Sequence, residues 1–403
     1  MPSIGARWLF DGIEAIYQEA LLVWEGERIL RVESFRAQHG ETYFSDAIIL
    51  PGLVNAHTHL DLSDLRAAQL PREPLAWLSS VITHRRQADA TSVARAMREG
   101  MRESLRYGVT LVGDIAGTLG NLEEWRTTAL RATVFVEIVG LSKQRARGTW
   151  QAARQLLTSW QRPNNVRLGL SPHAPYSTRR SLFALAARSG LPLAIHCLEF
   201  AEEHDLLAKR SGPFRMWLES LGAWDERGLM SGYEELLNLT ASAPRILFVH
   251  VNYPNDALEQ TLIHWAGLGR TGIVYCPRTH AFFGHPPHPW LRLLRLGVPV
   301  VFGTDSRASN PDLNVLNELR FVWKCGCPLS PKRLLNLVTH TAARLLGWPE
   351  TGTLCPGQLA DFIVMPLNQR PSDDPLSCLL ESQEAPLRVY IGGQLVYCTD
   401  ELS

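Results

Sequence analysis

Histidine and aspartate residues that could bind a metal ion end several short apolar runs of this sequence. His57 and His59 are separated by one residue in NAHTH, His196 ends LPLAIH, and Asp305 ends VPVVFGTD. Side chains two residues apart on a strand point the same way, so one ion can contact both imidazoles of the pair. A His-x-His pair alone is equally compatible with two ordinary polar residues. Together with His196 and Asp305 it predicts a site for one divalent ion, of a kind that suits zinc or ferrous iron.

Further ionisable residues lie at or just after the ends of similar runs. Asp114 ends TLVGD, His173 follows VRLGLSP, His250 ends RILFVH, and Glu199 lies three residues beyond His196. A single histidine such as His250 is by default more often a satisfied core residue than a functional one. Burying such groups alone is costly, so each needs a partner, and their number favours a shared site. The acidic residues that follow, Glu202, Glu203 and Asp205, are predicted to form a solvated helix start.

The elements that must position these residues are eight short apolar runs separated by helix-like stretches. The intervening segments include TSVARAMREGMRESLRYG, SLFALAARSG, DALEQTLIHWAG and LNVLNELRFVW. This alternation predicts a (β/α)8 barrel over residues 51–349, whose strands end at one shared mouth. A doubly wound open sheet is the alternative, and the lack of a glycine fingerprint after the first run disfavours it. The eight runs are 52–57, 110–114, 133–139, 166–171, 191–196, 245–250, 272–276 and 298–305.

Both ends of the chain differ from this middle part. Residues 1–50 contain short apolar runs with little helical period, and TGTLCPGQLADFIVM and PLRVYIGGQLVYC near the end have Gly and Pro turns between strand-like runs. We therefore predict one small β-sandwich domain assembled from residues 1–50 and 350–403.

The motifs PGLVNAHTHLDLSDL, SPHAPYST, IHCLEFAEEHDLL, FVHVNY, CPRTHAFF and FGTDSRASNPDLNVLNEL together resemble the cytosine/guanine deaminase and chlorohydrolase branch of the amidohydrolase superfamily. The similarity covers nearly the whole chain. Within that branch HLDLS, PLAWLSSVITHRR and GPFRMWLESLG are most similar to the aminodeoxyfutalosine deaminases. The resemblance implies that His57, His59, His196 and Asp305 bind one metal, zinc in preference to iron.

The resemblance also implies catalytic roles. Glu199 would move protons, and His250 and Asp305 would orient or activate a metal-bound water that attacks an amino-bearing ring carbon and releases ammonia. His173, Trp77, His280 and Asp61 are the predicted substrate contacts. Packing is an equally good interpretation for Trp77, and a structural role is the alternative for His173. His84, Arg85 and Arg86 could meet a substrate carboxylate or ribose, with surface charge as the alternative.

The sequence departs from the family pattern in two places. Relatives usually have asparagine where this chain has His280, and the following GHPPHPW adds His285 and His288, which we interpret as part of a proline-stiffened loop. Binuclear relatives use a carboxylated lysine at a strand end. None of the four lysines of this chain ends a predicted strand, so one metal is expected.

Composition excludes several other classes of function. Forty basic and forty acidic residues balance, without a basic run that would bind nucleic acid. The sequence lacks a signal-peptide pattern and a long apolar stretch, and its seven cysteines form no framework, so free thiols in a reducing cytoplasm are expected. Relatives are often dimers, but no sequence pattern here indicates a homodimer.

These observations predict a hydrolytic deaminase of an amino-substituted purine-like ring or nucleoside, with 6-amino-6-deoxyfutalosine as the favoured substrate. One alternative is hydrolysis of another C–N or C–Cl bond of a heterocycle by the same site. Another, from a different class, is a non-catalytic binding protein on a decayed barrel, which the complete set of site residues disfavours.

Overall fold

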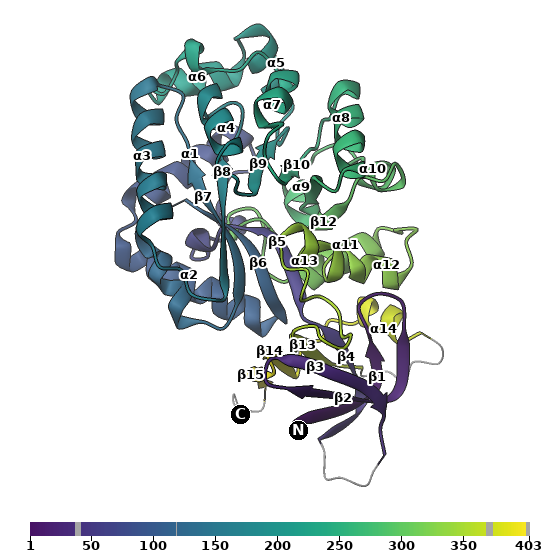
Figure 1. Ribbon diagram of the computed structural model, residues 1–403. Helices are drawn as coiled ribbons and strands as arrows, with labels where there is room; N and C mark the ends of the chain where they lie inside the picture. The colour runs from purple at the N-terminus through teal and green to yellow at the C-terminus, as the bar shows by residue number, and fades with distance from the viewer. Residues whose placement is uncertain (37–41, 118, 368–373, 400–403) are drawn as a thin grey trace.

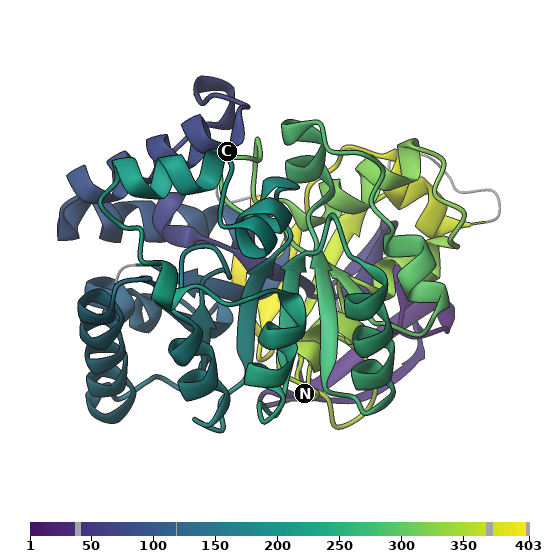
Figure 2. The same cartoon turned by 90° about the horizontal axis from the view of Figure 1, so that it is seen from above.

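Eight parallel strands form a nearly closed barrel in the computed structural model, which describes residues 1–36, 42–117, 119–367 and 374–399 (Figure 1). Neighbours in the barrel follow each other in sequence, and helices surround the strands in the view from above (Figure 2). Each strand coincides with one predicted apolar run, which confirms the barrel. The strands are β5 (Leu53–Thr58), β6 (Val109–Ala116), β7 (Arg131–Ile138), β8 (Val166–Pro172), β9 (Leu193–Cys197), β10 (Ile246–His250), β11 (Thr271–Tyr275) and β12 (Val300–Phe302).

The last and first strands of the barrel are joined by side chains and by the loop after β12. Asn55 Nδ2 donates to Thr304 Oγ1 at 2.8 Å, and the Thr304 N–H donates to Asn55 Oδ1 at 3.0 Å. The N–H of Asp305 donates to the His57 carbonyl at 3.0 Å. Gly303 permits this approach, because a Cβ there would lie 2.8 Å from the His57 backbone nitrogen. Closure of the barrel therefore places Asp305 beside His57.

Several helices begin at a capping side chain that the sequence supplies. Asp89 and Ser92 form a capping box at the start of α2, which buries Val93, Met97 and Met101 at intervals of one helical turn. The helices are α1 (Pro74–Gln87), α2 (Ala90–Arg106), α3 (Lys143–Ser159), α4 (Arg180–Ala187), α5 (Glu202–Lys209), α6 (Pro213–Ser220), α7 (Tyr233–Thr240), α8 (Asp256–Gly267), α9 (Pro277–Phe283), α10 (Trp290–Arg295), α11 (Val315–Lys324), α12 (Pro331–Asn336), α13 (His340–Leu345) and α14 (Pro375–Glu381).

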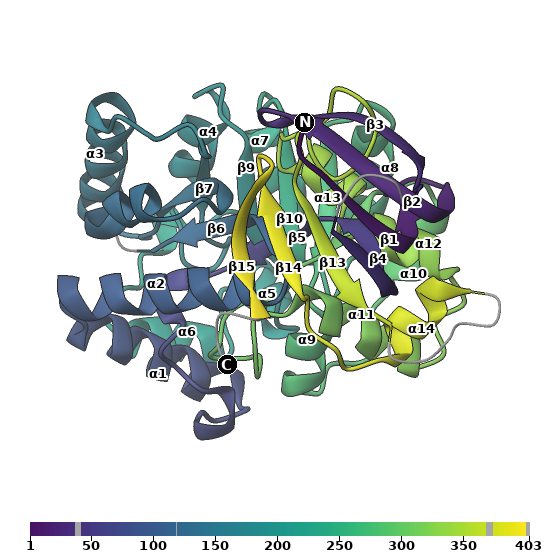
Figure 3. The same cartoon turned by 90° about the horizontal axis from the view of Figure 1, so that it is seen from below.

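A second sheet of seven strands lies below the barrel and combines both ends of the chain, as predicted (Figure 3). Its order is β15-β14-β13-β4-β1-β2-β3. β4 pairs in parallel with β1 and antiparallel with β13, so it joins the two ends of the chain. The strands are β1 (Ser3–Phe10), β2 (Ile16–Glu25), β3 (Arg28–Ser34), β4 (Tyr43–Pro51), β13 (Phe362–Pro366), β14 (Arg388–Ile391) and β15 (Gln394–Cys398).

A buried ion pair connects this sheet to the barrel. Arg131, the first residue of β7, donates from Nε to Asp361 Oδ2 at 2.7 Å and from Nη2 to Oδ1 at 3.1 Å. Asp361 is fully buried and also accepts from Thr351 Oγ1 and from the Gly392 N–H. A paired, fully hydrogen-bonded carboxylate of this kind fixes the orientation of two packed elements.

The seven cysteines are free thiols. None of the helices in the described part of the chain combines the length and the apolar character needed to cross a bilayer.

Candidate active site

The four predicted metal ligands converge at the carboxyl ends of the barrel strands. His57 lies in β5, His59 just after it, His196 in β9, and Asp305 just beyond β12. Asp305 Oδ1 lies 3.5 Å from His57 Nε2 and 3.6 Å from His59 Nε2. Ligand atoms of His57, His196 and His250 also lie within 4.8 Å of one another. His57 belongs to both groups, His57–His59–Asp305 and His57–His196–His250, and each group is compact enough to hold one ion.

The chemistry of this donor set fits a divalent cation. The His57 side chain is 1% exposed, and neither of its ring nitrogens has a hydrogen-bond partner among the described residues. Such an unsatisfied buried group is costly unless something else binds it. His196 Nδ1 lies 3.2 Å from the His173 carbonyl, which can only accept, so Nε2 keeps its lone pair. Burial lowers the pKa of His59 and of His196 well below the usual value, which keeps both rings neutral, as ligands must be.

The backbone at the site occupies a region that non-glycine residues rarely adopt. Leu198, His250, Val251 and Asp305 have φ angles of 52°, 72°, 54° and 58°. Each such residue costs about 1–3 kcal/mol and persists only where the surrounding structure determines it. The Asn252 N–H donates to the Leu198 carbonyl at 3.0 Å and so ties the turn after β10 to the turn after β9. The positive φ angles of His250 and Asp305 themselves set the direction in which their side chains leave the backbone.

Glu199 lies beside the ligand cluster. Its side chain is 6% exposed, and its Oε1 is 3.7 Å from His250 Nε2. Burial, together with the carboxylates of Asp305 and Glu203, raises the pKa of Glu199 well above the usual value, which favours the protonated form of its carboxyl. Burial lowers the pKa of His250 to about 3, which keeps its ring neutral. The pair combines a proton donor with a neutral acceptor, as general acid–base chemistry requires.

The prediction that Glu203 belongs to a solvated helix start is wrong. Glu203 is 0% exposed and accepts hydrogen bonds from three backbone N–H groups of the preceding turn, including that of Glu199 at 2.8 Å, and from Tyr233 Oη at 3.1 Å. Glu202 and Asp205 are exposed, as predicted. The physical reason is that the unpaired N–H groups before a helix attract one carboxylate inward. In a run of neighbouring acidic residues, the sequence does not show which side chain is buried against these N–H groups.

Two of the predicted substrate contacts lie near the ligands. His173, just after β8, has Nδ1 2.7 Å from Ser177 Oγ and a ring centroid 4.8 Å from that of His196. Asp61 is buried and accepts from Arg85 Nε at 3.0 Å. The Asp61 side chain therefore positions Arg85, and its contact with substrate stays a prediction.

Trp77 and His280, the other two, are engaged by protein groups. The Trp77 indole N–H donates to the Ala308 carbonyl at 2.9 Å. His280 contacts Asn252 Oδ1 through Nδ1 at 3.2 Å and the Pro286 carbonyl through Nε2 at 2.8 Å. These contacts pack α1 and α9 against the site loops, and a contact of either side chain with substrate stays a prediction.

The GHPPHPW segment packs against the turn that carries His250. His288 Nε2 donates to the His250 carbonyl at 2.7 Å, and its ring stacks on Tyr275 with centroids 4.1 Å apart. His285 Nδ1 lies 2.8 Å from Tyr253 Oη. The loop therefore holds the strained turn that carries His250.

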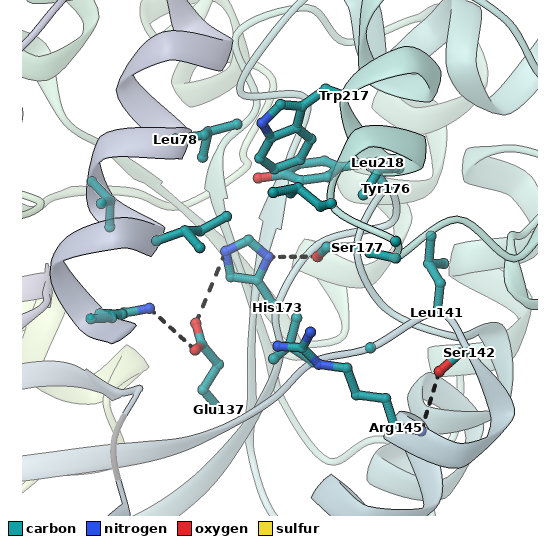
Figure 4. Close-up of a pocket in the computed structure, with 18 of the residues that line it drawn as sticks. Leu78, Glu137, Leu141, Ser142, Arg145, His173, Tyr176, Ser177, Trp217 and Leu218 are labelled. Atoms are coloured by element: carbon teal, nitrogen blue, oxygen red, sulfur yellow. Dashed lines mark hydrogen bonds and ion pairs between the residues drawn. The ribbon is translucent and has the colours of Figure 1, made fainter. Parts of the chain in front are cut away.

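A cavity of about 350 Å³ lies between α1, α6 and the segments after β7 and β8 (Figure 4). Its apolar lining includes Leu78, Leu141, Trp217 and Leu218, and its polar lining includes Arg85, Glu137, Arg145 and His173. Glu137 was not singled out from the sequence. The available signal was a single carboxylate near the end of the apolar run TVFVEIV.

The sequence matches the amidohydrolase family over residues 48–396. An aminodeoxyfutalosine deaminase from Deinococcus radiodurans is 29% identical over 330 residues, which are 77% of this chain and 76% of that protein. The solved structure of Helicobacter pylori aminofutalosine deaminase in complex with methylthio-coformycin has a TM-score of 0.84 at 23% identity, over 98% of this chain and 100% of that chain. An adenosine deaminase from Xanthomonas campestris with bound zinc has a TM-score of 0.81 at 22% identity, over 99% of this chain and 93% of that chain. These likenesses confirm the predicted fold.

Proposed function

Because this chain belongs to the amidohydrolase family, we propose that it is a metal-dependent hydrolase that releases ammonia from a purine-like nucleoside. The observation that carries the proposal is the cluster of buried imidazoles and Asp305 beside Glu199, whose pKa is raised by burial and by neighbouring carboxylates. Relatives named as aminodeoxyfutalosine deaminases support 6-amino-6-deoxyfutalosine as the favoured substrate.

His57, His59, His196 and Asp305 would hold the metal. Three imidazoles and one carboxylate suit zinc, and a zinc-containing structural relative supports that choice over iron. A divalent ion bound there supplies a Lewis acid beside which water ionises near neutral pH.

The remaining residues move protons. Deamination transfers the water oxygen to the ring carbon and releases the amino group as ammonia, so one water proton must reach the ring nitrogen and the other the leaving amine. Glu199, in its protonated form, would donate its proton to the ring nitrogen, take one proton from the attacking water and pass it to the leaving amine. It would then recover the second water proton as the carbonyl forms. His250 and Asp305 would accept hydrogen bonds from the water and orient it. The part of the nucleoside that does not react would lie in the cavity beside His173.

Ammonia release from a defined panel of substrates tests this proposal. The zinc-loaded protein would be incubated with adenosine, 5′-deoxyadenosine, 5′-methylthioadenosine and 6-amino-6-deoxyfutalosine, with ammonia measured by a coupled assay and the product by mass spectrometry. We expect ammonia and the corresponding oxo product in equal amounts from at least one nucleoside. Hydrolysis of other heterocycles without ammonia would favour a different leaving group. A chain that neither binds metal nor turns over any substrate would refute catalysis altogether.

A further inference from the structure

Glu137 is a buried carboxylate whose hydrogen-bonding capacity is largely unused. It lies near the end of β7 and lines the cavity, and its side chain is 6% exposed. Oε1 has no hydrogen-bond partner among the described residues, and the one hydrogen bond found at Oε2 comes from Arg85 Nη1 at 3.4 Å. A carboxylate can accept about four hydrogen bonds, so this group lacks donors. Burial without them is costly, which indicates that a ligand supplies them.

Arg85 holds this carboxylate in place. Its guanidinium bridges Asp61 and Glu137, with Nε 3.0 Å from Asp61 Oδ2. Gly117 makes room for it, because a Cβ there would lie 2.6 Å from Arg85 Cζ. A pre-oriented acceptor of this kind is typical of a recognition site, because the side chain loses little freedom when the ligand binds.

The charges around the cavity select the chemistry of that ligand. Arg85, Arg86 and Arg145 line the same cavity as Glu137, and Figure 4 shows Arg145 extending along it toward His173. Three guanidinium groups disfavour an ammonium partner for the carboxylate. Neutral hydroxyl groups donate hydrogen bonds without adding positive charge, so they fit better.

The position of Glu137 relative to the metal ligands fits a sugar. The rings of His196 and His173 have centroids 4.8 Å apart, and His173 Nε2 lies 4.0 Å from Glu137 Oε1. Glu137 is therefore one side chain beyond the ligands, on the cavity side. In a purine nucleoside the fused rings separate the amino-bearing carbon from the sugar, so a nucleoside reacting beside Glu199 extends its sugar away from the ligands and into this cavity.

We propose that Glu137 accepts hydrogen bonds from the ribose hydroxyl groups of the substrate and makes the enzyme select ribonucleosides over deoxyribonucleosides. This inference rests on the proposed nucleoside deamination. It assigns sugar recognition to a residue at the end of the third barrel strand, apart from the groups that move protons.

The test compares each substrate with its own deoxy forms. The ribonucleoside with the highest kcat/KM in the panel, and its 2′-deoxy and 3′-deoxy analogues, would be assayed with the zinc-loaded wild type, Glu137→Gln and Glu137→Asp. We expect the wild type to lose about 10–100-fold in kcat/KM when a recognised hydroxyl is removed, as for other hydrogen bonds to charged groups. In Glu137→Gln the preference for the ribo form should fall to about two- to tenfold, because the amide oxygen still accepts a hydrogen bond but carries no charge. Glu137→Asp should retain part of the preference.

Glu99→Gln is the matched control, because Glu99 is exposed on α2 and its variant should keep the wild-type preference. Melting temperature and zinc content would be measured for every variant, and Glu137→Asp decides the matter if Glu137→Gln does not fold. A wild type that ignores the hydroxyls, or a Glu137→Gln variant that keeps the full preference, overturns the role of Glu137 while leaving deamination intact. Absence of ammonia from every ribonucleoside overturns both.

Discussion

Replacement of Glu199 by glutamine separates proton transfer from metal binding. The substitution keeps the size of a side chain that is 6% exposed and leaves the four proposed ligands in place. It removes a carboxyl whose raised pKa favours the protonated form that can donate to the substrate. Positioned acid–base groups contribute about 10²–10⁴-fold, so kcat should fall by that factor, or about 3–5 kcal/mol in the barrier. Zinc content and melting temperature should stay at wild-type values.

The assay is steady-state ammonia release with zinc measured by elemental analysis on the same samples. Glu202→Gln is the matched control, since Glu202 lies three residues away on the exposed side of α5. It should behave as the wild type. Turnover of Glu199→Gln within about threefold of the wild type would refute the proton-transfer role, because general acid–base contributions are far larger. Loss of zinc in that variant would instead mean that Glu199 is a ligand.

Three further outcomes are expected elsewhere in the molecule. His196→Ala should lower bound zinc below one equivalent by elemental analysis, and full retention would mean that the ligand set is wrong. His288→Phe keeps a ring beside Tyr275 but removes the hydrogen-bond donor to the His250 carbonyl. The free energy of unfolding should therefore fall by about 1–3 kcal/mol, and kcat/KM should fall with it. An unchanged kcat/KM would mean that this hydrogen bond does not position His250. Arg131→Met leaves the buried Asp361 without its partner and should cost about 3–5 kcal/mol in denaturant unfolding, whereas a loss below about 1 kcal/mol would show that the pair contributes little.

The barrel and the ligand cluster could be predicted because they follow from local signals. Each strand is a short apolar run, and parallel strands of a barrel end at the same mouth. Residues that end different runs, such as His196 and His250, are therefore expected to lie near one another once the topology is known. The hydrogen bond from the Asp305 N–H to the His57 carbonyl could not be predicted from the sequence, because it depends on the approach of the last barrel strand to the first.

The residues that were missed have contacts that no local pattern encodes. Glu203 belongs to an acidic run, and only the arrangement of the preceding turn turns it inward. Glu137 lies in an apolar run, and its position in the lining of the cavity is visible only once the strands and helices are assembled. Helix α14 had a signal that was overlooked, since Asp374 followed by Pro375 is a typical helix start.

The acids of the site differ in protonation because their neighbours differ. Burial disfavours charge at Asp305, but the histidines that surround its carboxylate, His57 first among them, outweigh burial and hold the pKa of Asp305 below its usual value. Glu199 is buried too, but its charged neighbours are the carboxylates of Asp305 and Glu203, so its pKa is raised. Asp305 therefore has two effects, as a proposed ligand and as a cause of the raised pKa of Glu199. Removing it would disturb both, whereas His196→Ala tests metal binding while leaving both carboxyl groups in place.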